Sequence, residues 1–228
     1  MNVTNQPPDG GPVSVRVWGD FACFTRPEFG VERVSYPVMT PTAAVGVLDA
    51  IFWKPEFRWR IVAIDVLRPV RWIQVRRNEI TTRQTIRTAK AWASGDDEGY
   101  DAASPKHRAQ RAGLLLAAVA YVIYAHPDVR PGVDSPSAKY RDQLRRRVRR
   151  GQYHEHPYLG CREFPCDFSD PDPAEPRLAW DEHLGPVIHS VYAGPDDPRT
   201  AATASPIFFD AQVQAGRMIV PRLPGGRR

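Results

Sequence analysis

The sequence predicts an α+β fold, in which a ferredoxin-like N-terminal domain is followed by a small antiparallel β subdomain. Between residues 13 and 126 the predicted elements follow the order β-α-β-β-α-β, which is the order of the ferredoxin-like unit. After residue 152, short strand candidates alternate with Pro-rich turns, a pattern typical of antiparallel strands. The chain has 228 residues, of which 42% are hydrophobic, and this suits one large or two small globular domains.

The first strand and the first helix have clear local signals. Val13–Trp18 alternates valine with other residues, as a strand with one buried face does. Residues 21–39 show no clear period and contain Pro and Gly, so we expect a loop. Thr40-Pro41 is a helix start, because Thr accepts a hydrogen bond from a free N–H and Pro suits the first helical position. We expect this helix to end at Lys54-Pro55.

Further elements complete the predicted N-terminal domain. Residues 59–67 are β-branched and apolar, and residues 70–75 are the next strand candidate after Pro69 interrupts the pattern. Residues 81–103 are polar and Gly-containing, so we expect a mobile excursion. Ser104-Pro105 then predicts a second helix that reaches about residue 115. A further strand is expected at 117–126, where apolar residues alternate again.

The C-terminal part of the chain is expected to begin with a basic helix. Residues 127–134 are a linker candidate, after which Ser135-Pro136 starts a third helix and Gly151 stops it at the C′ position. Strands are predicted at 187–192, 207–213 and 217–220. The predicted organisation is therefore a flexible tail at 1–12, a ferredoxin-like domain at 13–126, and a basic helix with a β subdomain at 127–228.

The basic residues of the chain are almost all arginines. The formal net charge is +5, with 27 Arg and 4 Lys against 26 acidic residues. Arg binds phosphate through two parallel hydrogen bonds and stacks on bases, which favours a nucleic-acid partner. Codon usage in a GC-rich genome explains the preference for Arg over Lys, but not its clustering. The three cysteines form no disulfide framework, and the sequence contains no recognisable signal peptide or membrane span, so we expect a cytoplasmic protein without membrane contact or bound metal.

Four segments of the chain together resemble a known family. They are Phe21–Ala44 with its continuation through Ile51-Phe-Trp-Lys-Pro, then Arg76-Arg-Asn-Glu, Gln110–Leu116 and Pro157–Phe168. In these segments the sequence resembles the CRISPR-associated Cas-five family of subtype I-C, whose members have an RRM-like, ferredoxin-like N-terminal domain. The resemblance implies an endoribonuclease that cuts CRISPR repeat hairpins in precursor RNA. It also implies that the protein stays on the 5′ handle of the product as a subunit of the surveillance complex, Cascade.

The resemblance further implies the chemistry and the partners. Relatives of this subtype cut RNA without a metal or another cofactor: the 2′-hydroxyl attacks the neighbouring phosphate, which leaves a 2′,3′-cyclic phosphate and a 5′-hydroxyl. The implied partners are CRISPR repeat RNA or crRNA, the Cas-seven backbone subunit and the Cas-eight large subunit, with target DNA in the complex as a further candidate. The alternative function is a non-catalytic subunit that only binds and caps the 5′ handle.

The resemblance also assigns candidate catalytic residues. In the family, a Tyr at the end of the first helix and a Lys-His pair on a later helix carry out the reaction; the matching residues here are Phe52, Lys139 and Tyr140. Tyr140 would need a cation such as Lys139 to act as a phenolate base. Phe52 and Tyr140 also lie on apolar helical stripes, where packing alone explains them. His154 and His156 are candidates for the missing imidazole, because neutral His suits proton transfer near pH 7, although surface histidines without a role are the alternative.

Arginines cluster in the third predicted helix, in two rows of i, i+4 spacing formed by Arg141, Arg145 and Arg149 and by Arg146 and Arg150. A solvated helix face usually mixes charges of both signs, but Asp142 is the one acid among these ten residues, 141–150. We therefore expect this helix to bind RNA phosphates. Arg76 and Arg77, at the end of a predicted strand, are weaker candidates for the same role. Trp18, Phe21 and Phe24 are suited either to stacking on bases or to core packing.

Overall fold

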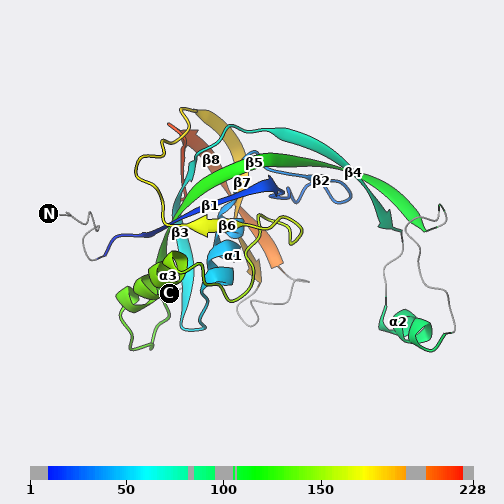
Figure 1. The fold of residues 1–228 in the computed structure, drawn as a ribbon, viewed down its shortest axis with the longest axis horizontal. Helices are drawn as coiled ribbons and strands as arrows, with labels where there is room; N and C mark the ends of the chain where they lie inside the picture. The colour runs from blue at the N-terminus through cyan, green and yellow to red at the C-terminus, as the bar shows by residue number, and fades with distance from the viewer. Residues whose placement is uncertain (1–9, 82–84, 96–104, 106, 194–203, 223–228) are drawn as a thin grey trace.

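The computed structural model describes residues 10–81, 85–95, 105, 107–193 and 204–222 (Figure 1). Its strands are β1 (Val13–Ala22), β2 (Arg33–Val34), β3 (Phe57–Val66), β4 (Trp72–Ile80), β5 (Arg108–Val129), β6 (Asp167–Ser169), β7 (Glu182–Ala193), β8 (Ala204–Gln214) and β9 (Arg217–Ile219). Its helices are α1 (Pro41–Ile51), α2 (Ile86–Ala93) and α3 (Ser137–Arg149). The strands form one mostly antiparallel sheet, so the predicted α+β class is confirmed.

β5 is the central strand of this sheet. It pairs antiparallel with β1 on one side and with β3 on the other, and the longest path through the sheet is β6-β1-β5-β3-β9-β8-β7. The ferredoxin-like arrangement is not confirmed. That fold places its first and third strands side by side, whereas here β1 and β4 both pair with β5 and are not neighbours.

The C-terminal strands continue the same sheet. β9 pairs with β3, and β8 and β7 follow as an antiparallel hairpin. Arg217 donates two hydrogen bonds, of 2.5 and 2.7 Å, to the nearly buried carboxylate of Asp65, which ties β9 to β3. The predicted strands at 187–192 and 207–213 lie inside β7 and β8, and the one at 217–220 is one residue longer than β9. The predicted domain division at residue 126 stays a prediction.

Two helices pack on one face of the sheet. α1 contacts β3 and β7, α3 contacts β1 and β5, and the two helices touch each other, so the sheet curves around α1. Thr40 caps α1 by accepting a hydrogen bond from the N–H of Ala43 at 3.3 Å, as the sequence predicts. Gly151, with a φ of 60°, ends α3 in the left-handed conformation that favours glycine. None of the described helices is long and apolar enough to cross a membrane.

An arm of two strands projects from the sheet (Figure 1). It consists of β4 and the first part of β5, paired antiparallel from Trp72 opposite Leu116 to Ile80 opposite Arg108. Between β3 and β4 the pairing with β5 is interrupted, and Pro69, which has no N–H to donate, falls in this interruption. The arm therefore leaves the sheet at the place where the sequence pattern breaks.

The predicted helix at 104–115 is wrong. Residues 108–115 belong to β5, where they pair with β4 along the arm. A short apolar run such as Leu114–Leu116 suits a helix or a buried strand equally, and the long-range pairing decides between them. The helix that forms in this region is α2, inside the predicted excursion at 81–103, with Thr85 as its N-cap. The mobility predicted there is untested: residues 82–84 and 96–104 lie outside the described part of the chain, as do residues 1–9 of the predicted tail.

Candidate active site and basic surfaces

The first turn of α3 places two of the predicted catalytic residues beside a carboxylate. The hydroxyl of Tyr140 donates a hydrogen bond to Oε2 of Glu56 at 2.5 Å. Lys139 is exposed, and its Nζ donates to the hydroxyl of Ser135 at 3.3 Å. The same nitrogen lies 5.7 Å from the centre of the Tyr140 ring. A carboxylate, a phenol and an ammonium group therefore meet at one position.

The environment of Tyr140 favours its neutral form. The residue is buried, with 1% of its surface exposed. The hydrogen bond to Glu56 raises the pKa of the Tyr140 hydroxyl above its ordinary value, and burial adds to the rise. The phenolate that Lys139 was expected to stabilise is thus disfavoured, because the nearest charge partner of the hydroxyl is an acid. Within this pair Tyr140 is the proton donor and Glu56 is the acceptor.

Phe52 packs in the core, as its place on the apolar stripe predicts. Its ring centre lies 5.6 Å from that of Phe57, which in turn lies 4.6 Å from the ring of Tyr140. Arg147 covers the Phe52 ring at 5.3 Å and donates to the carbonyl of Ile51 at 2.6 Å. The fold therefore brings positions 52 and 140 together through one intervening ring, although they are far apart in the sequence.

His154 and His156 lie beyond the opposite end of α3. The N–H of His154 donates to the carbonyl of Ala50 at 2.8 Å, which holds this segment beside the last turn of α1. Both histidines are exposed. α3 has 13 residues, about 20 Å of helix, with Lys139 and Tyr140 in its first turn. In the described part of the chain no hydrogen bond or ring contact links either imidazole to Lys139 or Tyr140.

Three of the α3 arginines predicted to bind RNA are engaged by other protein groups. Arg141 is nearly buried, with 7% of its surface exposed, and its Nη1 lies 3.4 Å from the hydroxyl of Ser137. Two ion pairs involve the others: Arg145 with Asp142 at 3.3 Å, and Arg149 with Asp170 at 3.1 Å. Burial leaves Arg141 little surface to offer to a phosphate, and the two paired guanidinium groups are partly neutralised.

The other two arginines predicted to bind RNA, Arg146 and Arg150, present free positive charge at the end of this helix. Arg146 and Arg150 are exposed and form no ion pair with another described residue. They lie at i, i+4 spacing near the C-terminus of α3, where the helix dipole also favours cations. The RNA-binding role predicted for the helix therefore depends most on these two side chains.

The arm carries a second set of basic residues. Arg76 is exposed on β4, whereas its neighbour Arg77 points to the other face and is half-buried. Nη1 of Arg77 lies 2.6 Å from Oε1 of Glu163, which also accepts a hydrogen bond from Arg33 at 2.9 Å. Glu163 thus ties the middle of the arm to the segment that follows α3, and Arg76 is the arginine of this pair that is available to a ligand.

The aromatic residues considered for stacking occupy different environments. Phe24 is buried in the core. The guanidinium of Arg16 lies 4.3 Å from the ring centre of Trp18, so this ring already has a cation on one face. Phe21 is exposed and lies 6.4 Å from Phe164. Core packing therefore explains Phe24, and Phe21 is the most accessible of the three.

Two of the three cysteines lie together. Sγ of Cys161 is 3.7 Å from the carbonyl oxygen of Cys23, and both sulfurs contact the hydroxyl of Thr25, at 3.5 Å for Cys23 and 4.0 Å for Cys161. A hydrogen bond between the two thiol side chains, donated by Cys23, lowers the pKa of Cys161, helped by Thr25 and Arg33, while the pKa of Cys23 is raised. Burial raises the pKa of Cys166 to about 12. In the described ranges no group of three or more His, Cys, Asp or Glu is arranged to hold a metal ion.

Glu56 is the site residue that sequence reasoning missed. Glu56 directly follows Lys54-Pro55, and it belongs to no periodic pattern or sequence motif that would indicate a function. The available signal was its position, four residues after Phe52, in the turn that leads from the first helix to the next strand. Only the contact between this turn and α3 identifies Glu56 as the partner of Tyr140.

The sheet with its arm, and the helix that bears Lys139 and Tyr140, are those of a CRISPR-associated protein of the Cas5 group. The family model described as "CRISPR-associated protein (Cas_Cas5)" matches residues 13–221. The chain belongs to the Cas5d family, which is the Cas-five family of subtype I-C, so the predicted resemblance is confirmed.

Two curated relatives and one solved structure illustrate the relationship. The chain is 42% identical over 221 residues to "CRISPR pre-crRNA endoribonuclease Cas5d" of Thermus thermophilus, covering 92% of this chain and 91% of the relative. It is 38% identical over 223 residues to the protein of the same name from Mannheimia succiniciproducens, covering 92% and 94%. A solved structure entitled "Crystal Structure of CRISPR-associated Protein" is similar in fold, with a TM-score of 0.65, 22% identity and 92% coverage of both chains.

Proposed function

We propose that this protein is a metal-independent endoribonuclease that cleaves CRISPR repeat hairpins in precursor RNA and then stays bound to the 5′ handle as a subunit of the type I-C surveillance complex. The observation that carries the proposal is the cluster of Glu56, Lys139 and Tyr140 at the start of α3. Two of these three residues occupy positions that the family uses for catalysis. The names of the two curated relatives, both pre-crRNA endoribonucleases, support the same activity.

The reaction needs two proton transfers and a positive charge. The 2′-oxygen bonds to phosphorus while its proton goes to a base, and the bond from phosphorus to the 5′-oxygen breaks as that oxygen receives a proton. We assign the first proton to Glu56, which already accepts a hydrogen bond, and the charge on the crowded phosphate to Lys139. Tyr140, which keeps its proton, orients Glu56 through their hydrogen bond.

His154 and His156 belong to this proposal in a second position. The N–H of His154 donates to the carbonyl of Ala50 in the last turn of α1, two residues before Phe52, the residue that replaces the family's Tyr, and His156 follows two residues later in the chain. An imidazole there would protonate the leaving oxygen if the RNA crosses from the start of α3 to the end of α1. The test is the pH dependence of the cleavage rate, because loss of a catalytic imidazole removes the limb of the profile that reports its protonation.

Binding of RNA is assigned to the basic surfaces. Arg146 and Arg150 on α3 and Arg76 on the arm are exposed cations placed to contact phosphates. Arg77, Arg145 and Arg149 are secondary candidates, since each already has an acidic partner. Within the complex, the proposed protein partners are the Cas-seven backbone subunit and the Cas-eight large subunit, with target DNA as a further candidate, and the proposed compartment is the cytoplasm.

The second candidate function is a subunit that caps the 5′ handle without cutting. The observations that favour it are the buried ring of Phe52, which has no hydroxyl, and the raised pKa of Tyr140. Under this alternative the purified protein binds its own repeat hairpin but leaves it whole.

One experiment separates the two functions and tests the mechanism. Purified protein is incubated with its own repeat hairpin in EDTA, in parallel with the same hairpin carrying a single 2′-deoxy sugar on the nucleotide before the cut. We expect the all-RNA hairpin to be cut in the presence of the chelator and the deoxy hairpin to be bound but uncut. Cutting of the deoxy hairpin, or arrest by EDTA, contradicts the mechanism, and binding without cutting of either RNA supports the capping function.

A further inference from the structure

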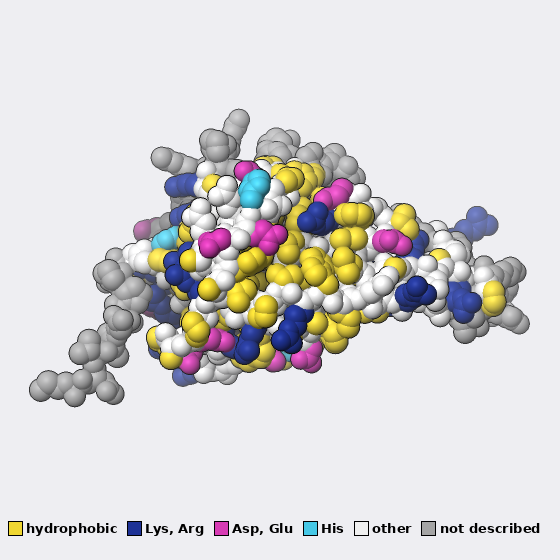
Figure 2. All heavy atoms as spheres, turned by 90° about the horizontal axis from the view of Figure 1, so that it is seen from above, with side chains coloured by type: hydrophobic (Ala, Val, Ile, Leu, Met, Phe, Trp, Pro, Cys, Tyr) yellow, Lys and Arg dark blue, Asp and Glu magenta, His cyan; other side chains and the backbone are white. Residues whose placement is uncertain are grey.

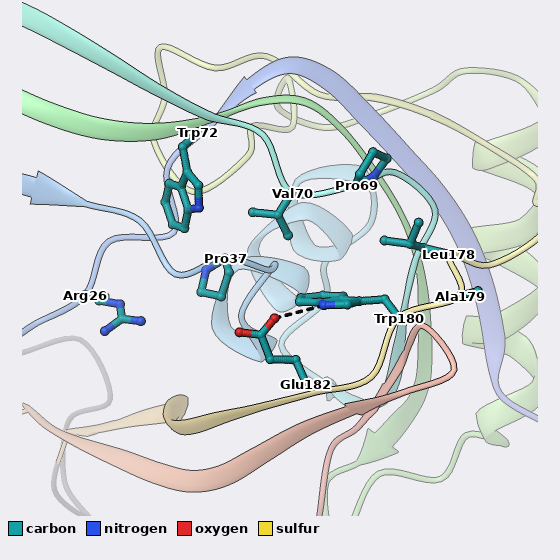
Figure 3. A pocket seen from close by; sticks show the side chains of 9 residues that line it. All are labelled: Arg26, Pro37, Pro69, Val70, Trp72, Leu178, Ala179, Trp180 and Glu182. Carbon is teal, nitrogen blue, oxygen red and sulfur yellow. Dashed lines mark hydrogen bonds between the residues drawn. The ribbon is translucent and has the colours of Figure 1, made fainter.

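An apolar groove lies at the base of the arm. None of the residues that line it belongs to the cluster of Glu56, Lys139 and Tyr140. Its volume is about 570 Å³, within the range of roughly 300–1,000 Å³ that is typical of small-molecule sites. Four separate segments line it, through Arg26, Pro37, Pro69, Val70, Trp72, Leu178, Ala179, Trp180 and Glu182 (Figure 3). Two tryptophans therefore share one hollow, and neither the proposed chemistry nor the basic helix uses them.

Both tryptophans are held by backbone pairing before any ligand arrives. Trp72 is the first residue of β4 and pairs with Leu116 of β5, yet 46% of its surface is exposed. The carbonyl of Trp180 accepts a hydrogen bond from the N–H of Gly216 at 2.8 Å, and Val70 and Leu178, which also line the groove, pack against the core. Trp180 is half-buried against the core, whereas Trp72 is an exposed ring on a paired strand. An exposed aromatic ring on an ordered backbone indicates a binding site, because little backbone ordering is needed when a ligand binds.

Two charged groups border this aromatic surface (Figure 3). Oε2 of Glu182 accepts a hydrogen bond from Nε1 of Trp180 at 3.0 Å, and Oε1 is the second acceptor of the same carboxylate. The guanidinium of Arg26 lies 4.9 Å from the ring of Tyr36 and 3.6 Å from a carboxylate oxygen of Glu28, a long and exposed ion pair. The groove thus offers flat apolar walls, an acceptor for N–H donors and a cation at its rim.

The groove is continuous with one face of the arm. Side chains alternate along a strand, so every second residue of β4 from Trp72 onward shares a face. That face is exposed throughout, and it carries Trp72, Gln74, Arg76 and Asn78. Between Trp72 and Arg76 the strand advances about 13 Å. An aromatic ring followed by an amide and an arginine is the composition of surfaces that bind single-stranded nucleic acid.

We propose that the groove binds one unpaired nucleobase of the RNA, stacked on Trp72 and bordered by Trp180, with the amino-bearing edge of the base on Glu182 and its phosphate toward Arg26. The RNA strand then follows the exposed row of β4 to Arg76. A carboxylate accepts from the amino groups of guanine, adenine or cytosine, whereas uracil has no amino group to donate. This inference deepens the proposed function, since it rests on the binding of repeat RNA, and it names a position where the protein reads the chemistry of a base.

The test measures the affinity for the chain's own repeat hairpin, made uncleavable by a 2′-deoxy sugar at the cut. A base stacked on tryptophan predicts that Trp72→Ala weakens binding by about 5- to 150-fold, and that Trp72→Phe weakens it less. Phe208→Ala, which removes another exposed aromatic residue that does not line the groove, is the matched control and should bind as the wild type does. Melting temperatures of all variants show whether the fold is intact.

A scan with abasic nucleotides then locates the base. For the wild type, an abasic nucleotide at one position outside the duplex should lower the RNA affinity by the same factor. The affinity of Trp72→Ala should not change with that substitution. At this position, replacing guanine by inosine or adenine by purine removes one amino group. We expect the loss in affinity from this replacement to disappear in Glu182→Leu.

The outcomes separate the inference from the function beneath it. If the wild type fails to bind repeat RNA, the proposed function fails and the inference falls with it. If the wild type binds but Trp72→Ala binds equally well, only the inference is overturned. The same holds if every abasic substitution that weakens binding to the wild type weakens binding to Trp72→Ala equally. If Trp72→Ala binds RNA normally but no longer assembles into the surveillance complex, the groove takes a protein segment and the nucleobase is the wrong occupant.

Discussion

The hydroxyl of Tyr140, in the first turn of α3, donates a 2.5 Å hydrogen bond to Glu56, in the turn that follows α1. This contact joins two segments that are distant in the sequence and places a proton acceptor beside Lys139, whose Nζ is 5.7 Å from the Tyr140 ring centre. It also changes the chemistry expected of Tyr140, because a phenol that faces a carboxylate keeps its proton. The predictions below begin with this pair.

Glu56→Gln should slow cleavage of the repeat hairpin by roughly 100-fold or more, the usual contribution of a general base. The amide keeps the shape of the side chain but accepts a proton poorly, so RNA affinity should change by no more than a few fold. Single-turnover cleavage and binding are measured on the same preparation. Glu155→Gln, at an exposed carboxylate near His154, is the control and should cut normally. Wild-type cleavage by Glu56→Gln would exclude Glu56 as the base.

Lys139→Ala should remove cleavage while it leaves hairpin affinity within a few fold. The ammonium group is needed where charge develops on the phosphate in the transition state, and it contributes little to ground-state binding. Lys90→Ala, at an exposed lysine on α2, serves as the control. Equal cleavage rates for Lys139→Ala and the wild type would show that the family's lysine is not used here.

Arg146→Glu with Arg150→Glu should weaken RNA binding and flatten its salt dependence. Each lost phosphate contact lowers the slope of log affinity against log salt by about one. Arg145→Glu with Arg149→Glu should have a smaller effect, because those guanidinium groups already pair with Asp142 and Asp170. Filter binding over a range of salt concentrations gives both slopes, and identical slopes for all variants would place this face against solvent or protein.

Asp49→Asn should stabilise the protein at neutral pH. Burial raises the pKa of Asp49 to about 6 from 3.8, with Arg58 as a weaker opposing influence. The folded state therefore favours the protonated form of Asp49. The free energy of unfolding has the full contribution of this group below about pH 4 and loses it as pH rises through 6. This difference corresponds to at most about 3 kcal/mol at pH 7. Denaturant unfolding should show the gain from Asn at pH 7 and little difference at pH 4, and a gain independent of pH would exclude titration as its cause.

Iodoacetamide should alkylate Cys161 before the other cysteines at pH 7. The hydrogen bond from Cys23 lowers the pKa of Cys161, so its thiolate fraction is high, while Cys166 is buried and its pKa is raised to about 12. Because the folded pKa is lowered, the reaction should persist at pH values where ordinary thiols react slowly. Cys23→Ala removes the donor and should slow alkylation of Cys161 at pH 7. Peptide mass spectrometry locates the label, and uniform labelling of the cysteines contradicts the assignment.

Local signals predicted the helices that pack on the sheet. Thr40-Pro41 and Gly151 mark real ends of α1 and α3, because caps depend only on neighbouring residues. The helix expected at 104–115 is wrong for the opposite reason: pairing with β4 decided the conformation of that segment, and pairing is not visible in a local pattern. The alternation of 117–126 was recognised, but not its continuation into a strand of 22 residues.

The candidate site was predicted in part, for the same physical reasons. The resemblance pointed to Lys139, Tyr140 and Phe52, and the fold brings the last two together through Phe57. Glu56 required knowledge of which turn lies against α3. The groove between Trp72 and Trp180 was equally hidden, because its walls come from four segments whose approach depends on the curvature of the sheet.

The length of β5 has a consequence for how this family can vary. One strand forms both the arm and the middle of the sheet, and Ala118, with a φ of 51°, is a left-handed residue where the two parts meet. Because side chains alternate, an insertion of one residue between Trp72 and Arg76 would turn these two side chains to opposite faces of the arm. A longer arm that keeps this row on one face without a bulge therefore adds residues to both strands in steps of two.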